Sequence, residues 1–371
     1  MKRLESLDVL RGLNIFCLVV VDLYVHRLNR GNSLRSFILT SFSHKGWEGL
    51  SLLDLIMPLF LFISGVTIPY SLEKYRSLEH SHKSLGIQLC RRFIFLWILG
   101  MICNGNLLAL DSQHIYLYSH ALQAIAVGYL FCSLFFLYIQ RKYQIVIALC
   151  LLLFYWAAME FCSIEYYGNG NYSEQRNLAE GIDTIVLGRF RNNAQIIDGK
   201  VIVDPTYTYT WILSSLNFIV TVFTGMFAGQ ILRSRYSQSK KLSMLIIGGA
   251  IMIIVGMIMS LVHPIIKRIW TSSMVLVSSG FCFLFLSVFY YYIDCCGYKQ
   301  YTTMLKVYGM NSLTAYILSE VVNFTSITDS LLYGLKQFVG IYYPLVTITG
   351  NVLILYLILY VMYRNKYFIR V

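Results

Sequence analysis

Charged residues are scarce in this chain. Of its 371 residues, 13% are Asp, Glu, Lys or Arg, while 57% are hydrophobic. A soluble globular protein is about a quarter charged and about half apolar, so this composition excludes a water-soluble chain. The aromatic share of 15% also excludes a disordered chain, because so much ring surface cannot stay solvated.

Several chemical motifs are also missing. The sequence contains no GxGxxG, no P-loop and no GxSxG, which argues against a nucleotide hydrolase and an α/β-hydrolase. Its nine cysteines form no CxxC pair, and the adjacent Cys295 and Cys296 suit neither a disulfide framework nor a zinc site. No His, Asp and Glu residues share metal-ligand spacing on a helix, so we expect no metal.

Long continuous apolar runs are abundant. They lack the alternation in segments of about ten residues that a β-barrel shows, and each is close to the roughly 20 residues that span a bilayer as a helix. The runs predict an all-α, polytopic transmembrane bundle. The ten predicted spans lie at about 9–26, 50–70, 93–110, 120–139, 144–162, 207–232, 242–262, 272–292, 307–323 and 342–363.

The basic residues indicate how the spans are oriented. The net charge is +12, and nearly two thirds of the 30 Lys and Arg residues fall at the ends and in the loops that share a side with the N-terminus. That side should be cytoplasmic, so both termini are expected inside, and the charge needs no nucleic-acid partner. No small-residue cleavage site follows the first apolar run, which predicts a retained span. The external loops are then about 27–49 and 163–206, within a single domain over 1–371.

Ionisable residues inside spans are costly and therefore candidates for function. These are Asp8, Asp22, Asp54 and Glu320. Asp8 shares a helix face with Arg11, which leaves a structural ion pair and a functional role equally open. No basic residue adjoins Asp22 or Asp54 in its span, so we favour function for both.

A histidine and a pair of glycines are two further features of the sequence. His44 precedes the span that contains Asp54 and suits proton transfer or transient acyl carriage, although an isolated outer-loop histidine is more often a surface residue. Gly225 and Gly229 are four residues apart, and this spacing of small residues predicts close helix packing.

Five segments together resemble a known family. They are Arg3-Leu4-Glu5-Ser6-Leu7-Asp8-Val9-Leu10-Arg11-Gly12-Leu13, the segment from His44 through Trp47, Asp54 and Pro58 to Phe62, Ala121-Leu122-Gln123-Ala124-Ile125, Lys267-Arg268-Ile269-Trp270-Thr271-Ser272-Ser273, and Gly309-Met310-Asn311-Ser312-Leu313. In this order they are similar to motifs of the heparan-α-glucosaminide N-acetyltransferase family.

The resemblance implies an activity. Family members transfer an acetyl group from cytosolic acetyl-CoA to a glucosamine amine across the membrane, and their active-site histidine corresponds to His44. The orientation inferred from Lys and Arg independently puts His44 outside, as this activity requires. Asp22 and Glu48 stand where the family has Asn, which leaves the acceptor open. The large domain that precedes the core of the lysosomal enzyme is missing, so we expect a bacterial inner-membrane protein with its site toward the periplasm.

The expected site combines catalytic and binding residues. Asp22 or Asp54 would orient His44, as the third member of a catalytic triad orients its histidine. The substrate-binding candidates are Trp47, Glu48, Gln123, Trp270 and Asn311. The tryptophans would stack on a sugar, although the interfacial aromatic belt also predicts tryptophan there. Gln123 and Asn311 would hold the thioester oxygen or the sugar, although each also fits an interhelical amide. Arg11, Arg91 and Arg92 would meet the phosphates of acetyl-CoA, or anchor span ends.

Two other functions remain open at this stage. One is O-acetylation of an envelope polysaccharide, in which the acceptor is a hydroxyl. The other is a proton-coupled transporter without acyl chemistry that uses Asp22, Asp54 and Glu320. The expected partners are an amino-sugar or glycan acceptor and membrane lipid, and the sequence leaves a homodimer open.

Overall fold

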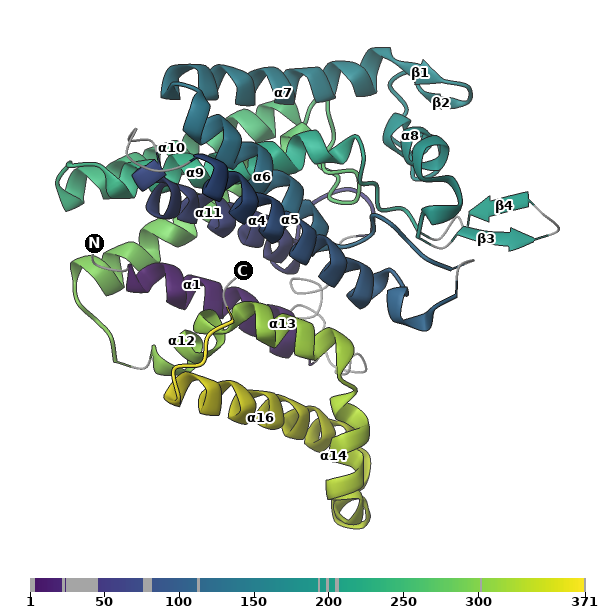
Figure 1. Ribbon diagram of the computed structural model, residues 1–371, viewed down its shortest axis with the longest axis vertical. Coiled ribbons are helices and arrows are strands. Elements are labelled where there is room, and N and C mark those ends of the chain that lie inside the picture. Colours follow the sequence, from purple (N-terminus) through teal and green to yellow (C-terminus); the bar gives the residue numbers. More distant parts are fainter. Residues whose placement is uncertain are drawn as a thin grey trace. The chain divides into compact units, whose positions relative to one another are not determined.

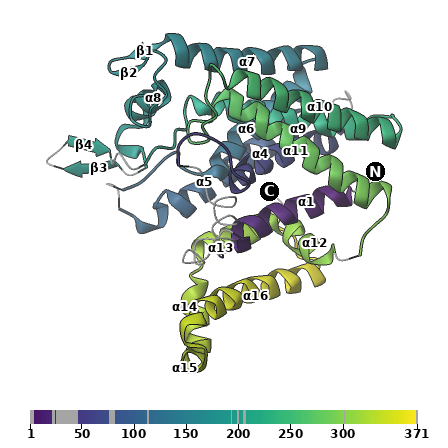
Figure 2. The ribbon, with the colours of Figure 1, turned by 180° about the vertical axis from the view of Figure 1, so that it is seen from behind.

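The computed structural model describes residues 4–21, 24, 46–75, 82–111, 114–192, 194–197, 200–203, 207–300 and 302–369. The chain divides into two compact units (Figures 1 and 2). Unit 1 comprises Met1–Lys45, Ser51–Ile56 and Phe285–Arg370, and unit 2 comprises chiefly Gly46–Leu50 and Met57–Leu284. Each unit is described by itself.

Eight helical segments in the described part of the chain are long and apolar enough to cross a membrane. They are Leu53–Tyr75, Leu85–Asn104, Ala121–Tyr138, Arg141–Phe161, Ser214–Arg233, Gln238–Met259, Ser272–Cys295 and Phe324–Arg364. The predicted class, a helical membrane protein, is therefore confirmed. These segments correspond to eight of the ten predicted spans, and the total of ten and the orientation of the termini stay predictions.

The two remaining predicted spans differ from these eight. The first, at about 9–26, is described as α1 (Glu5–Phe16) followed by a π-helical turn at Cys17–Val21. The ninth, at about 307–323, is divided into α12 (Thr303–Met310) and α13 (Ser312–Val321), with Asn311 between them. An apolar run in the sequence does not reveal such a division, because the mean hydropathy of about 20 residues does not show where a helix is interrupted.

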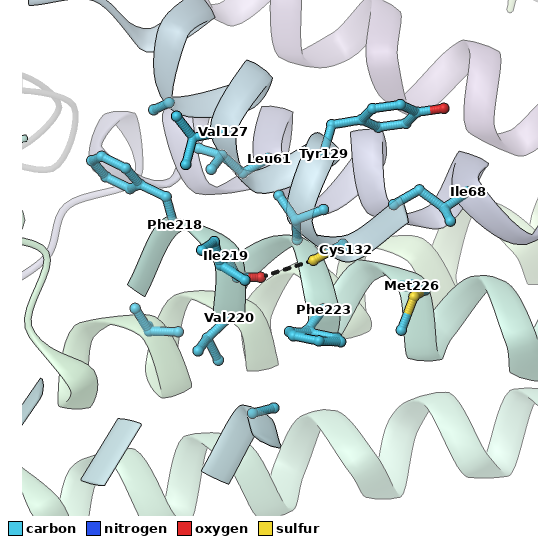
Figure 3. Close-up of a cluster of buried hydrophobic side chains, with 14 of the residues drawn as sticks. Leu61, Ile68, Val127, Tyr129, Cys132, Phe218, Ile219, Val220, Phe223 and Met226 are labelled. Carbon is cyan, nitrogen blue, oxygen red and sulfur yellow. Dashed lines mark hydrogen bonds between the residues drawn. The ribbon is translucent and has the colours of Figure 1, made fainter. Parts of the chain in front are cut away.

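Unit 2 is a helical bundle around an apolar core. Its helices are α4 (Ile56–Leu72), α5 (His82–Asn104), α6 (Ala121–Tyr138), α7 (Arg141–Phe161), α9 (Ser214–Arg233), α10 (Gln238–Met259) and most of α11 (Ser272–Phe289). Figure 3 shows side chains of α4, α6 and α9 meeting in this core, among them Leu61, Val127 and Phe223. Cys132 is completely buried there, and its thiol donates to the carbonyl oxygen of Ile219 at 3.2 Å. This cysteine is therefore a packing residue.

Helices α4 and α9 approach each other closely. A Cβ atom added to Gly225 would lie 1.9 Å from the carbonyl oxygen of Phe62, and one added to Gly229 would lie 2.4 Å from that of Val66. Only glycine permits backbones to come this near. The close packing predicted from Gly225 and Gly229 is confirmed.

The long predicted loop at 163–206 contains its own secondary structure. Strands β1 (Ser163–Ile164) and β2 (Tyr167–Gly168) form one antiparallel hairpin, and β3 (Ala194–Ile197) and β4 (Lys200–Val203) form another. Helix α8 (Leu178–Leu187) lies between these hairpins in the chain and packs against the first. We call Ser163–Val203 the hairpin segment.

Unit 1 is built on a crossing of α1 and α12. A Cβ atom on Gly12 would lie 1.7 Å from the carbonyl oxygen of Leu305, and one on Gly309 would lie 1.8 Å from that of Asp8, so the two backbones touch. Helix α16 (Tyr343–Arg364) packs against α12, α13 and α14 (Phe324–Leu332), and the short α15 (Lys336–Val339) lies between α14 and α16 in the chain. Both Gly12 and Gly309 belong to family-like segments, which gives those segments a packing role.

Candidate active site

The predicted histidine and one predicted aspartate, His44 and Asp22, lie outside the described residues. The segment that follows His44 is well defined within unit 2. The backbone N–H of Gly49 donates to the carbonyl oxygen of Ile265 at 2.8 Å, and Glu48 forms an isolated antiparallel bridge with Ile266. Gly49 has a φ of 103°, a conformation that favours glycine. The chain just after His44 is thus attached to the loop between α10 and α11.

A tryptophan and a tyrosine provide a second attachment. The half-buried Trp47 donates its indole N–H to the carbonyl oxygen of Tyr172 at 2.8 Å. The Tyr172 hydroxyl lies 3.0 Å from Glu160 Oε2 and 2.9 Å from His263 Nδ1. Trp47 is therefore bonded to the hairpin segment, and Glu48, beside it, is exposed.

The proton positions in this network follow from its donors. The backbone N–H of Ser272 donates to His263 Nε2 at 3.0 Å, so a neutral ring carries its proton on Nδ1. Nδ1 then donates to the Tyr172 oxygen, and the hydroxyl donates to Glu160. Burial lowers the pKa of His263 to about 4, which keeps the ring neutral near pH 7. Burial, with the Glu160 carboxylate, raises the pKa of Tyr172.

Asp54 has a structural partner at the start of the Leu53–Tyr75 span. Its Oδ2 accepts from the backbone N–H of Ser51 at 3.0 Å and from the Ser51 hydroxyl at 2.8 Å, while the Asp54 N–H donates to Ser51 Oγ at 3.3 Å. This reciprocal pair is a capping box. Nearby in unit 1, Asn14 donates its amide to the carbonyl oxygen of Ile56 at 3.0 Å. The buried carboxylate of Asp54 is thus held in a defined orientation.

Gln123 is completely buried, and both polar atoms of its carboxamide are hydrogen-bonded. Its oxygen accepts from the backbone N–H groups of Ser119 at 2.9 Å and His120 at 3.1 Å, and its nitrogen donates to the carbonyl oxygen of Leu117 at 2.6 Å. These bonds fix the N-terminus of α6, where His120 Nδ1 also accepts from the Leu122 N–H at 3.3 Å. Burial lowers the pKa of His120 to about 4.

Trp270 lies in the core of unit 2. Its side chain is 2% exposed, its indole N–H donates to Thr221 Oγ1 at 3.1 Å, and its ring meets Phe218 edge-on at 5.0 Å between centroids. Its carbonyl oxygen accepts from the Asn217 amide at 2.7 Å. The ring that would stack on a sugar is enclosed by protein, so its arrangement is that of a packing and positioning residue.

The side chain of Asn311 is buried like those of Gln123 and Trp270, but its surroundings differ. It is 1% exposed at the junction between α12 and α13, and neither its amide nitrogen nor its oxygen has a hydrogen-bond partner in the described part of the chain.

The predicted phosphate-binding arginines differ in their surroundings. Arg11 lies 3.8 Å from Asp8 Oδ1 within unit 1, so the predicted pairing on one helix face is present. On α5, the guanidinium of Arg92 stacks on the Tyr129 ring at 3.6 Å from its centroid. The neighbouring Arg91 is exposed and borders an open apolar groove with Ile87 and Phe95. Among the described His, Cys, Asp and Glu residues, no group of three or more could hold a metal ion.

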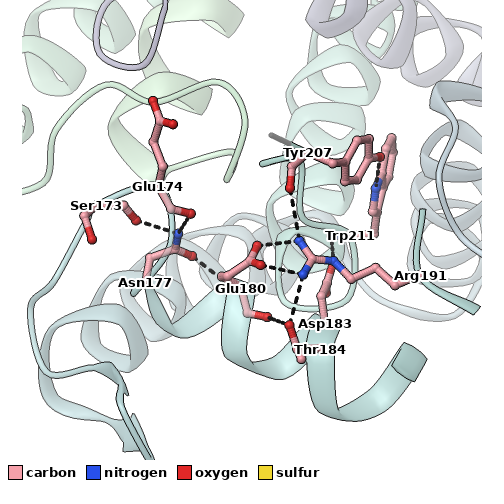
Figure 4. Close-up of polar contacts among 9 residues, drawn as sticks. All are labelled: Ser173, Glu174, Asn177, Glu180, Asp183, Thr184, Arg191, Tyr207 and Trp211. Atoms are coloured by element: carbon pink, nitrogen blue, oxygen red, sulfur yellow. Dashed lines mark hydrogen bonds and ion pairs between the residues drawn. The ribbon is translucent and has the colours of Figure 1, made fainter. Parts of the chain in front are cut away.

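Sequence reasoning missed a buried ionic network in the hairpin segment (Figure 4). Arg191 is 1% exposed and donates to both carboxylate oxygens of Glu180, as well as to Thr184 Oγ1 at 3.0 Å. Asp183 accepts from the backbone N–H groups of Trp211 at 2.7 Å and Ile212 at 2.9 Å. Burial raises the pKa of Asp183 to about 7, although these two hydrogen bonds act to lower it. The charges in an apparently polar loop gave no signal that they would be buried.

Comparisons with known proteins give a family model that matches the first part of the chain. The family model described as heparan-alpha-glucosaminide N-acetyltransferase, catalytic, matches residues 3–179, a little under half of the chain. This range includes His44 and Asp54.

Two curated relatives extend the similarity. The chain is 26% identical to heparan-alpha-glucosaminide N-acetyltransferase of Mus musculus over 370 residues, covering 86% of this chain and 54% of the mouse protein. It is 26% identical to the Homo sapiens protein of the same name over 371 residues, covering 86% and 53%. The chain spans about half the length of these relatives. The resemblance to the heparan-α-glucosaminide N-acetyltransferase family is confirmed.

Proposed function

We propose that the protein transfers an acetyl group from acetyl-CoA to the amine of a glucosamine-type sugar. The match to the catalytic family model over residues 3–179 carries this proposal. The attachment of Gly46–Leu50 to the α10–α11 loop and the hairpin segment supports it, because a catalytic histidine needs a well-defined backbone next to it.

The two substrates reach the site from opposite faces of the membrane. Acetyl-CoA cannot cross a bilayer, so its nucleotide stays at the cytoplasmic face, where Arg11, Arg91 and Arg92 meet its phosphates. The pantetheine arm is shorter than the roughly 30 Å hydrocarbon core, so it enters among the helices. His44 and the sugar lie toward the external face, which is the periplasm if the membrane is a bacterial inner membrane.

His44 serves in one of two ways. As a nucleophile, its imidazole nitrogen attacks the thioester carbonyl, the C–S bond breaks, and CoA leaves as a thiolate that takes up a proton. The sugar amine then attacks the acetyl-imidazole, loses a proton and releases His44. As a base, His44 removes the proton from the amine while the amine attacks the thioester carbonyl; the C–S bond breaks, and CoA leaves as a thiolate that takes up this proton. Asp22 or Asp54 orients the ring and stabilises its charged form.

The binding candidates divide by their surroundings. Trp47 and the exposed Glu48 adjoin His44 in sequence and contact the sugar. The bonded, buried side chains of Gln123 and Trp270 favour positioning roles. The unpaired amide of Asn311 favours direct contact with a substrate.

The decisive experiment is acetyl transfer from labelled acetyl-CoA to glucosamine by the purified full chain in detergent. His44→Ala is compared with the parent and with His114→Ala. His114 is a suitable control because it is partly exposed and bonded locally to Asp111 at 2.7 Å. We expect product from the parent and from His114→Ala, and none from His44→Ala.

The other outcomes separate the alternatives. Near-normal transfer by His44→Ala would overturn the role of His44. Binding of acetyl-CoA without acetylated glucosamine would favour a polysaccharide hydroxyl as acceptor. If acetyl-CoA did not bind at all, the enzyme proposal would fail and a transporter that depends on Asp22, Asp54 and Glu320 would take its place.

A further inference from the structure

The junction between α12 and α13 contains an asparagine that does not cap its helix. Asn311 occupies the N-cap position of α13, where asparagine normally accepts a backbone N–H. The N-cap asparagines of two other helices do so: Asn177 accepts from the Glu180 N–H at 2.9 Å, and Asn323 accepts from the Ser326 N–H at 3.2 Å. The Asn311 side chain makes no such bond. Its orientation therefore serves something other than the helix end.

Neighbouring polar groups are unpaired as well. Tyr308 Oη and Thr314 Oγ1 are buried and have no hydrogen-bond partner in the described part of the chain. Tyr308 lies in the last turn of α12 and Thr314 in the first turn of α13, each three positions from Asn311. A buried donor or acceptor without a partner destabilises the fold, and a carboxamide left unpaired at both ends does so twice. Such a cluster is best explained by a ligand that completes its hydrogen bonds.

The surroundings of this cluster are aromatic. Within unit 1, the Tyr308 ring meets Phe16 of α1 edge-on and Tyr356 of α16 at a tilt, each at 5.9 Å between centroids. A few isolated polar groups thus lie among apolar rings. This pattern suits a slender, mainly apolar ligand with widely separated amides. A sugar, with a hydroxyl on nearly every carbon, needs more partners.

We propose that Asn311 binds a secondary amide in the pantetheine arm of acetyl-CoA, an inference that rests on the proposed function. The Asn311 oxygen accepts from the ligand N–H, and its amide nitrogen donates to the ligand carbonyl. This two-point pairing uses both unpaired atoms. The hydroxyls of Tyr308 and Thr314 donate to other oxygens of the arm. Asn311 is then a donor-binding residue, distinct from the residues that contact the sugar.

The test compares stability with binding for Asn311→Leu, which keeps the size of the side chain and removes its amide. Thermal unfolding of the full chain in detergent is measured with and without acetyl-CoA. Without ligand, we expect Asn311→Leu to be at least as stable as the parent, because an unpaired buried amide is lost. The stabilisation by acetyl-CoA should disappear. Asn323→Ala, which removes a real cap in the same unit, should lower ligand-free stability and keep the response to acetyl-CoA.

A series of acetyl donors localises the effect. Acetyl-CoA and S-acetylpantetheine contain the amides, whereas S-butyl thioacetate contains none. We expect Asn311→Leu to raise KM by about tenfold for the first two donors, because the variant loses its hydrogen bonds to the ligand amide at a buried position. The kcat/KM for S-butyl thioacetate should fall less than the kcat/KM for the two donors that contain amides, and Tyr308→Phe should show a smaller effect with the same donor pattern.

Three results would overturn the inference: reduced ligand-free stability of Asn311→Leu, an equal penalty with S-butyl thioacetate, or an undiminished response to acetyl-CoA. Different results would contradict the proposed function. If the parent binds acetyl-CoA but acetylates no acceptor, the function is wrong while loss of binding in Asn311→Leu still supports the amide contact. If the parent does not bind acetyl-CoA, both proposals are wrong.

Discussion

The hairpin segment of unit 2 and the α12–α13 junction of unit 1 differ in whether their buried polar side chains are hydrogen-bonded. In the hairpin segment, Arg191 donates to Glu180 through two nitrogens, and both Asp183 oxygens accept backbone N–H groups. At the junction, Asn311 is equally buried and makes no hydrogen bond with a described residue. Paired groups organise the fold, whereas unpaired groups lower stability until a ligand binds.

The largest expected effect comes from breaking the paired network. Arg191→Leu leaves the Glu180 carboxylate buried without its cation, which should lower the free energy of unfolding by about 3–5 kcal/mol. Thermal unfolding of the purified chain measures this loss. Arg189→Leu is the matched control, because Arg189 is exposed two residues away and should change stability by less than about 0.5 kcal/mol. An unaffected Arg191→Leu variant would mean that this network does not hold the hairpin segment together.

His263 should make stability depend on pH. Its pKa is lowered to about 4 in the folded protein, while an exposed histidine titrates near 6.5. As the pH falls below 6.5, this histidine gains a proton in the unfolded chain but not in the folded protein. The free energy of unfolding therefore decreases. The contribution lost by about pH 4.5 is on the order of 2.5 kcal/mol.

The measurement isolates His263 by comparing His263→Gln with the parent across this pH range. The variant should lose less stability on acidification than the parent does. Asp183, with a raised pKa, acts in the opposite direction: its contribution decreases as pH rises from about 4 to about 7. Parallel curves for parent and His263→Gln would contradict a neutral, bonded His263.

The two carboxamides give the most direct comparison. Gln123→Leu removes three local hydrogen bonds and leaves backbone groups unpaired, so we expect a loss of about 2–3 kcal/mol. Asn311→Leu should cause no loss in the ligand-free protein. Chemical or thermal unfolding of both variants under one set of conditions provides the comparison. Equal losses would show that burial alone, and not pairing, determines what an amide contributes here.

The smallest expected effect is that of Tyr172→Phe. The variant keeps the backbone carbonyl that accepts from Trp47 but removes the hydroxyl between His263 and Glu160, which should reduce stability by about 1 kcal/mol. If this network positions the chain next to His44, kcat should fall with little change in KM. Tyr166→Phe, at an exposed tyrosine, is the control. A normal kcat would restrict Tyr172 to a structural role.

Much of the fold was predictable because apolar length is a local property. Eight predicted spans correspond to helices of the expected kind, and Gly225 and Gly229 predicted a close helix contact. The division of the predicted 307–323 span at Asn311 was not predictable, because it depends on how α12 packs against α1. The fold of the hairpin segment was missed for a similar reason, since short strands in a polar loop have no distinctive period.

The candidate site was predictable in part. The order of the motifs predicted a resemblance to the family whose catalytic model matches residues 3–179. The capping pair of Ser51 and Asp54 gives one of these motifs a local structural role. Residue type could not separate Gln123 from Asn311, nor show that Trp270 is enclosed. His44 and Asp22 lie outside the described residues, so their roles stay predictions.

The sequence by itself determined the class of the molecule: apolar segments of bilayer length must become helices, because every backbone polar group in lipid needs an internal partner. Its motifs also determined which family it resembles. Only the tertiary structure decided which buried side chains are satisfied, because a hydrogen bond depends on distance and direction between residues far apart in the chain. That distinction assigns Gln123 and Arg191 to the fold, and it is the basis of our proposal that Asn311 contacts a substrate.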